Sequence, residues 1–178
     1  MSKIMISQLS LKEQKALKPS IEDVIPEILD GDMKSNALNF VAWLRANKFS
    51  PGLKLINTWQ SSCKGKAICN IALRQDVWKN RNQFWDDKFW HIQLYVGVHQ
   101  YEEKIKNEGL QDFVWNNLGY CKNCNGNADI CSKKITVLEK EINNFGCWPL
   151  MWVYNPDEEA IENIKKLLLL EKEARSNS

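Results

Sequence analysis

The strongest periodicity in the chain is an alternation of apolar and mixed positions over residues 89–98. Because successive side chains of a strand point to opposite faces, this period of two predicts a β-strand with one apolar face. The opposite, mixed face carries His91, Gln93 and Tyr95. The apolar face is formed by Trp90, Ile92, Leu94, Val96 and Val98.

Shorter segments also carry strand signals. Residues 53–59 and 67–73 flank the turn signal at residues 64–66, Lys-Gly-Lys, and predict a hairpin. Residues 135–138 and 149–154 are two further strand candidates.

Helical spacing marks the stretches between these strands. Residues 32–47 predict a helix with Asp32 at its N-cap, because apolar residues recur on one face at Ala37, Leu38, Val41 and Leu44. Residues 101–118 predict a second helix, bent at Gly109. A short helix after Ser20 is expected to be interrupted at Pro26.

The final helix has a capping-box signature. Asn155 would be its N-cap, Pro156 its first residue and Glu158 its third. Its buried stripe is predicted at Ala160, Ile161, Ile164, Leu167 and Leu168.

Helices and strands come in blocks rather than in strict alternation, which favours an α+β fold. We expect an antiparallel sheet of about four to five strands packed by an N-terminal, a middle and a C-terminal helix. Residues 1–19 show little apolar periodicity and predict a loosely ordered lead-in. Residues 20–178 would then form one domain, an ordinary length for a single core.

Charge and hydropathy exclude several classes of protein. The formal net charge of the 178 residues is only +2, so we expect no nucleic-acid partner, although basic residues surround some tryptophans. The longest apolar run, residues 147–154, is far shorter than the ~20 residues that cross a bilayer. No secretory signal is visible near the start of the chain. These patterns predict a cytoplasmic protein without membrane contact.

The chain resembles a group of small bacterial proteins over residues 37–99. The resemblance rests on Asn57-Thr58-Trp59, on the Lys64-Gly65-Lys66 turn with Cys69 in the returning strand, and on the Trp90 strand. This pattern is similar to the YdhG-like group, some members of which are described as frataxin-like iron carriers. The resemblance implies an α+β fold. An iron-carrier role is not carried over, because acidic residues are scattered here rather than clustered.

Four of the six cysteines suggest a metal site. Cys121 and Cys124 have the two-residue spacer that aims two thiolates at one ion, and Cys131 with Cys147 would complete a structural Zn²⁺ site. If residues 134–138 and 149–153 formed a simple hairpin, Cys131 and Cys147 would lie about 23 Å apart at about 3.3 Å per residue, so a four-cysteine site needs a helix or loop over residues 139–146. The alternative is that both are buried thiols. A redox role is disfavoured, because the pair follows a predicted helix C-terminus, where the dipole opposes a thiolate.

The eight tryptophans suggest a binding site for an apolar or aromatic ligand. Trp43, Trp90 and Trp115 are expected in the core. The ligand site is instead predicted at Trp59, Trp78 and Trp85, which lie in or beside a hairpin and a polar loop, together with Tyr95 and His91 of the strand over residues 89–98.

No catalytic constellation appears in the sequence. We therefore expect a non-enzymatic protein that binds a small molecule or a protein partner. The alternative is a zinc-binding interaction module that uses the four cysteines.

Overall fold

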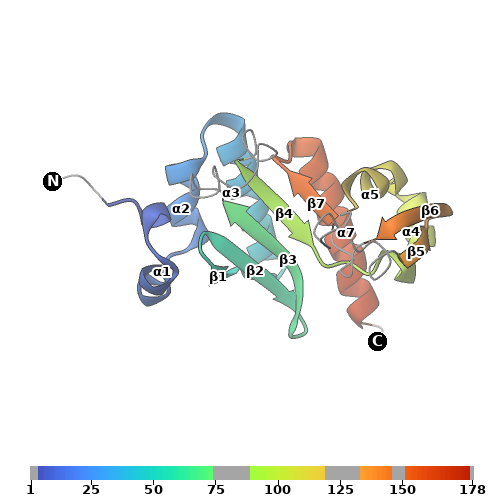
Figure 1. Cartoon of the computed structure of the whole chain (residues 1–178), viewed down its shortest axis with the longest axis horizontal. Helices are drawn as coiled ribbons and strands as arrows, with labels where there is room; N and C mark the ends of the chain where they lie inside the picture. Colours follow the sequence, from blue (N-terminus) through green and yellow to red (C-terminus); the bar gives the residue numbers. More distant parts are fainter. Residues whose placement is uncertain (1–3, 74–88, 119–132, 146–150, 177–178) are drawn as a thin grey trace. The chain divides into compact units, whose positions relative to one another are not determined.

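The computed structural model describes residues 4–73, 89–118, 133–145 and 151–176. These residues form an α+β fold, as the sequence predicts, with a five-stranded antiparallel sheet in the order β1-β2-β3-β4-β7 and a two-stranded sheet, β5-β6 (Figure 1). In chain order the elements are η1 (Ile6–Gln8), α1 (Leu11–Leu17), α2 (Ile21–Ile28), α3 (Gly31–Ala46), β1 (Gly52–Leu55), β2 (Thr58–Cys63), β3 (Lys66–Leu73), β4 (Trp90–Leu94), η4 (Val98–Gln100), α4 (Glu102–Asn107), α5 (Gln111–Asn117), β5 (Lys133–Val137), β6 (Lys140–Phe145), β7 (Met151–Tyr154) and α7 (Glu158–Ser176).

The chain divides into two compact units. Unit 1 comprises Met1–Gln93 and Val153–Ile161, and unit 2 comprises Leu94–Trp152 and Glu162–Ser178. Each unit is described by itself.

The core of unit 1 lies on one face of its strands. The predicted stripe of α3 is confirmed at Ala37, Val41 and Leu44, which are fully buried together with Phe40. The alternating residues Trp59, Ser61, Cys69 and Ile71 of β2 and β3 are buried as well. α3 runs behind the strands in Figure 1. Helix α2 packs on α3, and Arg45 Nε binds Glu22 Oε1 at 2.6 Å.

The predicted strand over residues 53–59 is wrong in one respect: it is two strands, β1 and β2, joined by a tight turn at Ile56 and Asn57. Asn57 has a φ of +49° and is only 2% exposed. Asparagine tolerates this left-handed conformation better than most residues do. Its side chain amide also donates to Ser7 O at 3.0 Å and accepts from Gln14 Nε2 at 2.7 Å, which fixes the turn.

The N-terminal residues, predicted as a loosely ordered lead-in, form η1 and α1 on unit 1. Ser10 and Glu13 cap α1 reciprocally. Glu27 accepts the backbone N–H groups of Ile6 and Ser7 at 3.1 and 2.8 Å, and so holds the start of η1. α2 has a similar cap, between Ser20 and Asp23, and it continues through Pro26 to Ile28 rather than stopping there.

Unit 2 departs from the sequence prediction in two places. The helix expected over residues 101–118 is broken into α4 and α5, because Gly109 takes a φ of +68°, which ends α4. Residues 134–138 and 149–153 do not form a hairpin with each other. β5 pairs with β6, a strand that the sequence did not predict, through a turn at Leu138 and Glu139, and β7 joins the larger sheet. The 23 Å separation, which assumed that hairpin, therefore does not apply.

The start of α7 is capped by Asp157 rather than by Asn155. Asp157 Oδ1 accepts the N–H of Ala160 at 2.8 Å, and its carbonyl accepts the N–H of Ile161. Asn155 lies before the helix and accepts the backbone N–H groups of Phe89 and Trp90 at 2.8 and 3.1 Å. It thereby ties the end of β7 to the start of β4. The predicted stripe at Ile161, Ile164, Leu167 and Leu168 is buried as expected.

Within the described parts of the chain, no helix is both long and apolar enough to cross a membrane.

Candidate functional site

A row of three amide side chains crosses the face of unit 1 opposite to its core. Gln60 on β2, Asn70 on β3 and Gln93 on β4 occupy the positions between buried neighbours and are half-buried themselves. Because Gln60 and Asn70 are paired in the antiparallel register, their side chains lie side by side on one face. Because alternate residues of a strand point to opposite faces, these three polar side chains lie on the face of the sheet away from the apolar core.

The three amides are joined head to tail. Gln60 Nε2 donates to Asn70 Oδ1 at 3.1 Å, and Asn70 Nδ2 donates to Gln93 Oε1 at 2.8 Å. Each carboxamide carries both a donor NH₂ group and an acceptor oxygen, so the row brings both kinds of group together on one face of the sheet.

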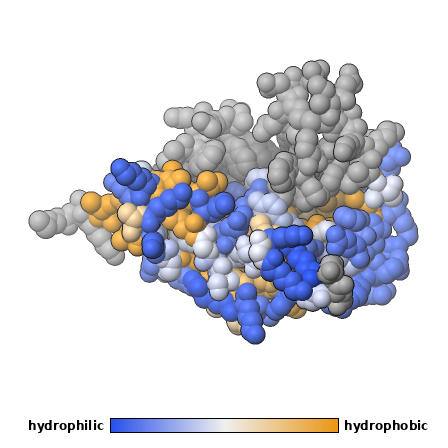
Figure 2. Space-filling view, turned by 90° about the horizontal axis from the view of Figure 1, so that it is seen from below, coloured by the Kyte–Doolittle hydropathy of each residue, from blue (hydrophilic) through white to orange (hydrophobic). Residues whose placement is uncertain are grey.

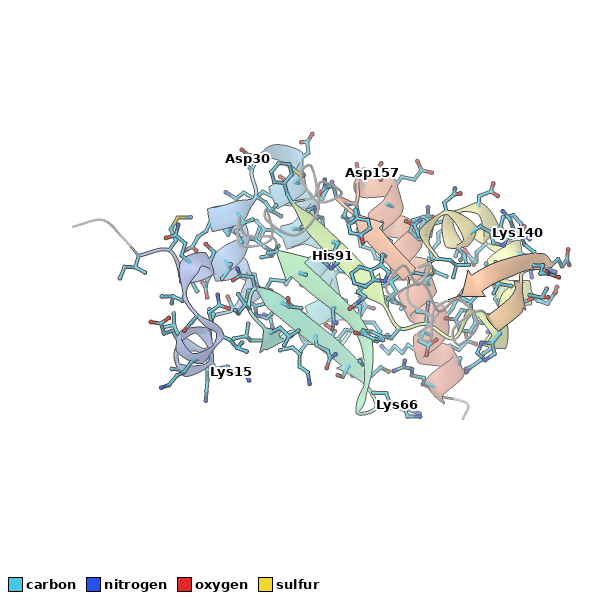
Figure 3. All side chains as sticks on the ribbon, viewed as in Figure 1. Lys15, Asp30, Lys66, His91, Lys140 and Asp157 are labelled. Carbon is cyan, nitrogen blue, oxygen red and sulfur yellow. The ribbon has the colours of Figure 1, made fainter. Side chains whose placement is uncertain are left out.

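Two rings adjoin this row at the next positions of the strands. The rings of His91 on β4 and Tyr154 on β7 have centroids 5.5 Å apart and planes at 50°. Both side chains are half-buried, and Figure 3 shows His91 on β4. Burial raises the pKa of the Tyr154 hydroxyl to about 12, so this group is a neutral donor at physiological pH. We define the ligand face as Gln60, Asn70, Gln93, His91 and Tyr154.

Among the described residues that were predicted to bind a ligand, His91 lies on the ligand face. Trp59 is 1% exposed and its indole N–H donates to Pro19 O at 3.4 Å, so it lies on the core side of β2, opposite to Gln60. Tyr95 is half-buried and belongs to unit 2. Trp78 and Trp85 lie outside the described residues.

The four cysteines of the predicted zinc site, Cys121, Cys124, Cys131 and Cys147, also lie outside the described residues. Among the residues that are described, no group of three or more His, Cys, Asp or Glu could hold a metal ion. Cys69 is fully buried, and burial raises the pKa of its thiol to about 12, which keeps it protonated and unreactive.

A second polar cluster lies in unit 2. Glu171 is 4% exposed and accepts hydrogen bonds from the Gly97 N–H at 2.7 Å, the Tyr101 hydroxyl at 2.9 Å and Arg175 Nε at 2.6 Å. Arg175 also donates to Tyr95 O at 3.1 Å. Because both carboxylate oxygens are bonded, the cluster is built to hold α7 against residues 95–101 rather than to receive a ligand.

The sequence did not identify Gln60, Asn70, Gln93 or Tyr154 as ligand residues, and the first two are the most informative cases. The signal was present, since Asn70 interrupts the apolar run of residues 67–73 and Gln60 follows Trp59, but their alignment depends on the register between strands. No known protein family, no curated protein and no solved structure matches the chain. The resemblance to the YdhG-like group therefore stays a resemblance, and the function has to be argued from the ligand face itself.

Proposed function

We propose that the protein is a non-enzymatic binding protein whose ligand is a small, planar heteroaromatic molecule held on the ligand face. The observation that carries the proposal is the hydrogen-bonded row of Gln60, Asn70 and Gln93 across three neighbouring strands.

The class of ligand follows from the chemistry of the face. Side-chain amides match the alternating donors and acceptors on the edge of a nucleobase, a nicotinamide or a similar ring. The rings of His91 and Tyr154 supply flat apolar area next to that row. Specific binding sites combine such area with a few placed polar groups.

The face offers binding groups but no catalytic arrangement. His91 has a ring contact with Tyr154, whose hydroxyl is protonated at physiological pH, as an ordinary tyrosine hydroxyl also is. The carboxamides of Gln60, Asn70 and Gln93 do not titrate. A role in binding is therefore the function that these groups support best.

Nuclear magnetic resonance provides the test. Side-chain amides give their own proton–nitrogen signals, so a panel of adenine, cytosine, nicotinamide and benzamide can be titrated against ¹⁵N-labelled protein. We expect at least one compound to shift the signals of Gln60, Asn70 and Gln93. If none of the four shifts these signals at millimolar concentration, the proposal fails.

A matched pair of variants separates the ligand face from a general effect. Asn70→Ala removes the middle amide of the row and should weaken binding about fivefold or more, given roughly 1–3 kcal/mol per unsatisfied polar group. Asn39→Ala removes an exposed amide on α3 and should leave binding unchanged. Equal effects of the two substitutions would contradict a site on the sheet.

The alternative function is a zinc-binding interaction module that uses Cys121, Cys124, Cys131 and Cys147. The observation in its favour is the register of β5 and β6, which pairs Lys133 with Phe145. Cys131 comes two positions before Lys133 in the sequence, and Cys147 comes two positions after Phe145. Elemental analysis of the purified protein tests this alternative, with Cys121→Ser as control; less than about a tenth of an equivalent of zinc removes it.

A further inference from the structure

A second surface of unit 1, separate from the ligand face, is formed by the strand β1. In the described part of the chain only β2 pairs with β1, so β1 is an edge of the five-stranded sheet. Gly52, Lys54 and Leu55 are exposed along it. An edge strand leaves one row of backbone N–H and C=O groups without a strand partner. An extended peptide can add to the sheet by bonding to such a row.

The stretch of sequence that contains β1 to β3 carries basic but no acidic side chains. The sequence has no acidic residue between Asp32 and Asp76. Four lysines in the same interval are exposed. Lys48 precedes β1, Lys54 lies on β1, Lys64 lies in the turn after β2, and Lys66 begins β3. Figure 3 shows Lys66 at the turn between β2 and β3. A negatively charged partner would therefore be attracted to this edge.

The edge also exposes apolar side chains. Leu55 is 57% exposed and Ile56 is 45% exposed, in the strand and in the turn that follows it. Leu17 is 56% exposed at the end of α1, one helical turn beyond Gln14, whose side chain bonds to Asn57 in the same turn. Figure 2 shows apolar atoms gathered in this N-terminal part of unit 1. Apolar groups rimmed by charge are typical of an interaction site.

We propose that β1 binds an extended acidic segment of another protein, which adds to the sheet beside β1. The backbone of that segment would bond to the outer edge of β1, its acidic side chains would face Lys54 and the neighbouring lysines, and its apolar side chains would cover Leu55 and Ile56.

Two other occupants fit the edge less well. A second copy of this chain, docking β1 on β1, would bring Lys54 and its neighbouring lysines against the same lysines of the other copy, an unfavourable arrangement. A nucleic acid would satisfy the lysines, but its phosphates are acceptors only and would leave the carbonyl groups of β1 unpaired. An acidic peptide can pair with the lysines, bond to the backbone of β1 and cover the exposed apolar side chains.

The first experiment uses labelled peptides of about ten residues in which glutamate alternates with valine and threonine, and fluorescence anisotropy with the full chain. Two N-methylated versions carry the methyl groups on odd or on even residues. Because only one set of N–H groups faces an edge strand, we expect one version to lose binding and the other to keep it. Equal binding of both versions would overturn the proposal.

The second experiment changes the protein. Lys54→Glu should weaken binding of the glutamate peptide about three- to tenfold, since it replaces an attraction by a repulsion at the rim. The matched control is Lys34→Glu, the same change of charge on α3, which should leave binding unaltered. A loss of binding that is equal in both variants would show general attraction to positive charge and would contradict a site at β1.

The remaining measurements address the other occupants. Heparin that displaces the peptide at equal concentration of negative charge would indicate a polyanion site and overturn the proposal. A dimer in sedimentation experiments that the glutamate peptide dissociates would point to β1 pairing with itself and would also overturn it. A monomer that binds the peptide and resists heparin supports it.

Discussion

Gln14 and Asn57 lie 43 residues apart in the chain and exchange two hydrogen bonds: Gln14 Nε2 donates to Asn57 Oδ1 at 2.7 Å, and the Asn57 backbone N–H donates to Gln14 Oε1 at 3.1 Å. Gln14 Nε2 also donates to the carbonyl of Ile6 at 3.0 Å. Gln14 is fully buried, so these bonds are shielded from water. This pair fixes the turn between β1 and β2 and holds α1 beside it.

Replacing Gln14 by alanine should therefore destabilise unit 1 strongly. The substitution leaves the Asn57 amide and backbone N–H without their buried partner, at a cost of about 2–4 kcal/mol in the free energy of unfolding. Urea denaturation followed by tryptophan fluorescence measures the loss. Gln8→Ala, at an exposed position of η1, should change stability by no more than about 0.5 kcal/mol.

Two substitutions at Asn57 distinguish the energetic contribution of its backbone conformation from that of its side-chain amide. Asn57→Gly removes the side-chain amide but keeps a residue that accepts a φ of +49°. Asn57→Ala removes the amide and also disfavours this φ. We expect Asn57→Ala to be less stable than Asn57→Gly by about 1 kcal/mol. Equal stability of the two variants would show that the backbone conformation carries no cost at this position.

Two buried tryptophans should respond differently to the same substitution. Trp59 donates its indole N–H to Pro19 O, but the buried Trp90 N–H has no hydrogen-bond partner among the residues that the structure describes. Phenylalanine removes a bond at Trp59 and an unsatisfied donor at Trp90. We expect Trp59→Phe to cost about 1–3 kcal/mol more than Trp90→Phe, measured by thermal or urea unfolding. The reverse order would mean that packing alone governs both positions.

Alkaline pH should destabilise the protein through its tyrosines. Burial and the neighbouring Glu171 raise the pKa of Tyr101, and burial raises that of Tyr154 to about 12. Above pH 10 the unfolded chain releases these protons while the folded protein retains them. Stability is thus fully present below pH 10 and falls above it, by about 1.4 kcal/mol per pH unit for each group until its folded pKa is reached.

Tyr101→Phe tests the contribution of one of these groups. The variant loses the hydrogen bond to Glu171 and should be less stable at pH 8 by about 1.5–3 kcal/mol. Its stability should nevertheless fall less steeply than that of the unaltered protein between pH 10 and 11. An identical slope, obtained from urea unfolding at each pH, would contradict the raised pKa of Tyr101.

Cys69 should be unreactive in the folded protein. Its thiol has a pKa of about 12 and is fully buried, so neither the thiolate nor the reagent is available. Labelling with iodoacetamide at pH 8, followed by mass mapping, should modify Cys69 only in denaturant. Modification within minutes under native conditions would show that β3 opens locally.

The sequence predicts the parts of the fold that depend on local pattern. The α3 stripe and the alternation of β4 follow from periods of 3.6 and two residues, and both are found. The break at Asn57 was missed because its conformation is fixed by Gln14, which no local pattern connects to it. β6 was missed because Lys140, Glu141, Asn143 and Asn144 give it little apolar alternation.

The candidate site could be predicted only in part. His91 was identified from the mixed face of its strand, but Gln60 and Asn70 become neighbours through the β2–β3 register. Trp59 was assigned to a ligand site because the lone hairpin gave no sign of the helices that cover its core side. The contacts that determine which of these side chains are buried and which are neighbours are long-range, so they cannot be identified from one sequence.

The place of β7 beside β4 also has a consequence for synthesis of the protein. β4 ends at Leu94, but its outer neighbour begins only at Met151, after α4, α5 and the β5–β6 hairpin have been made. On the ribosome, β1 to β4 can assemble early, while β4 keeps an unpaired border until the nascent chain supplies its last strand. Pausing or truncation of synthesis in this interval would leave an aggregation-prone intermediate with the edge of β4 exposed, which chaperones would have to bind.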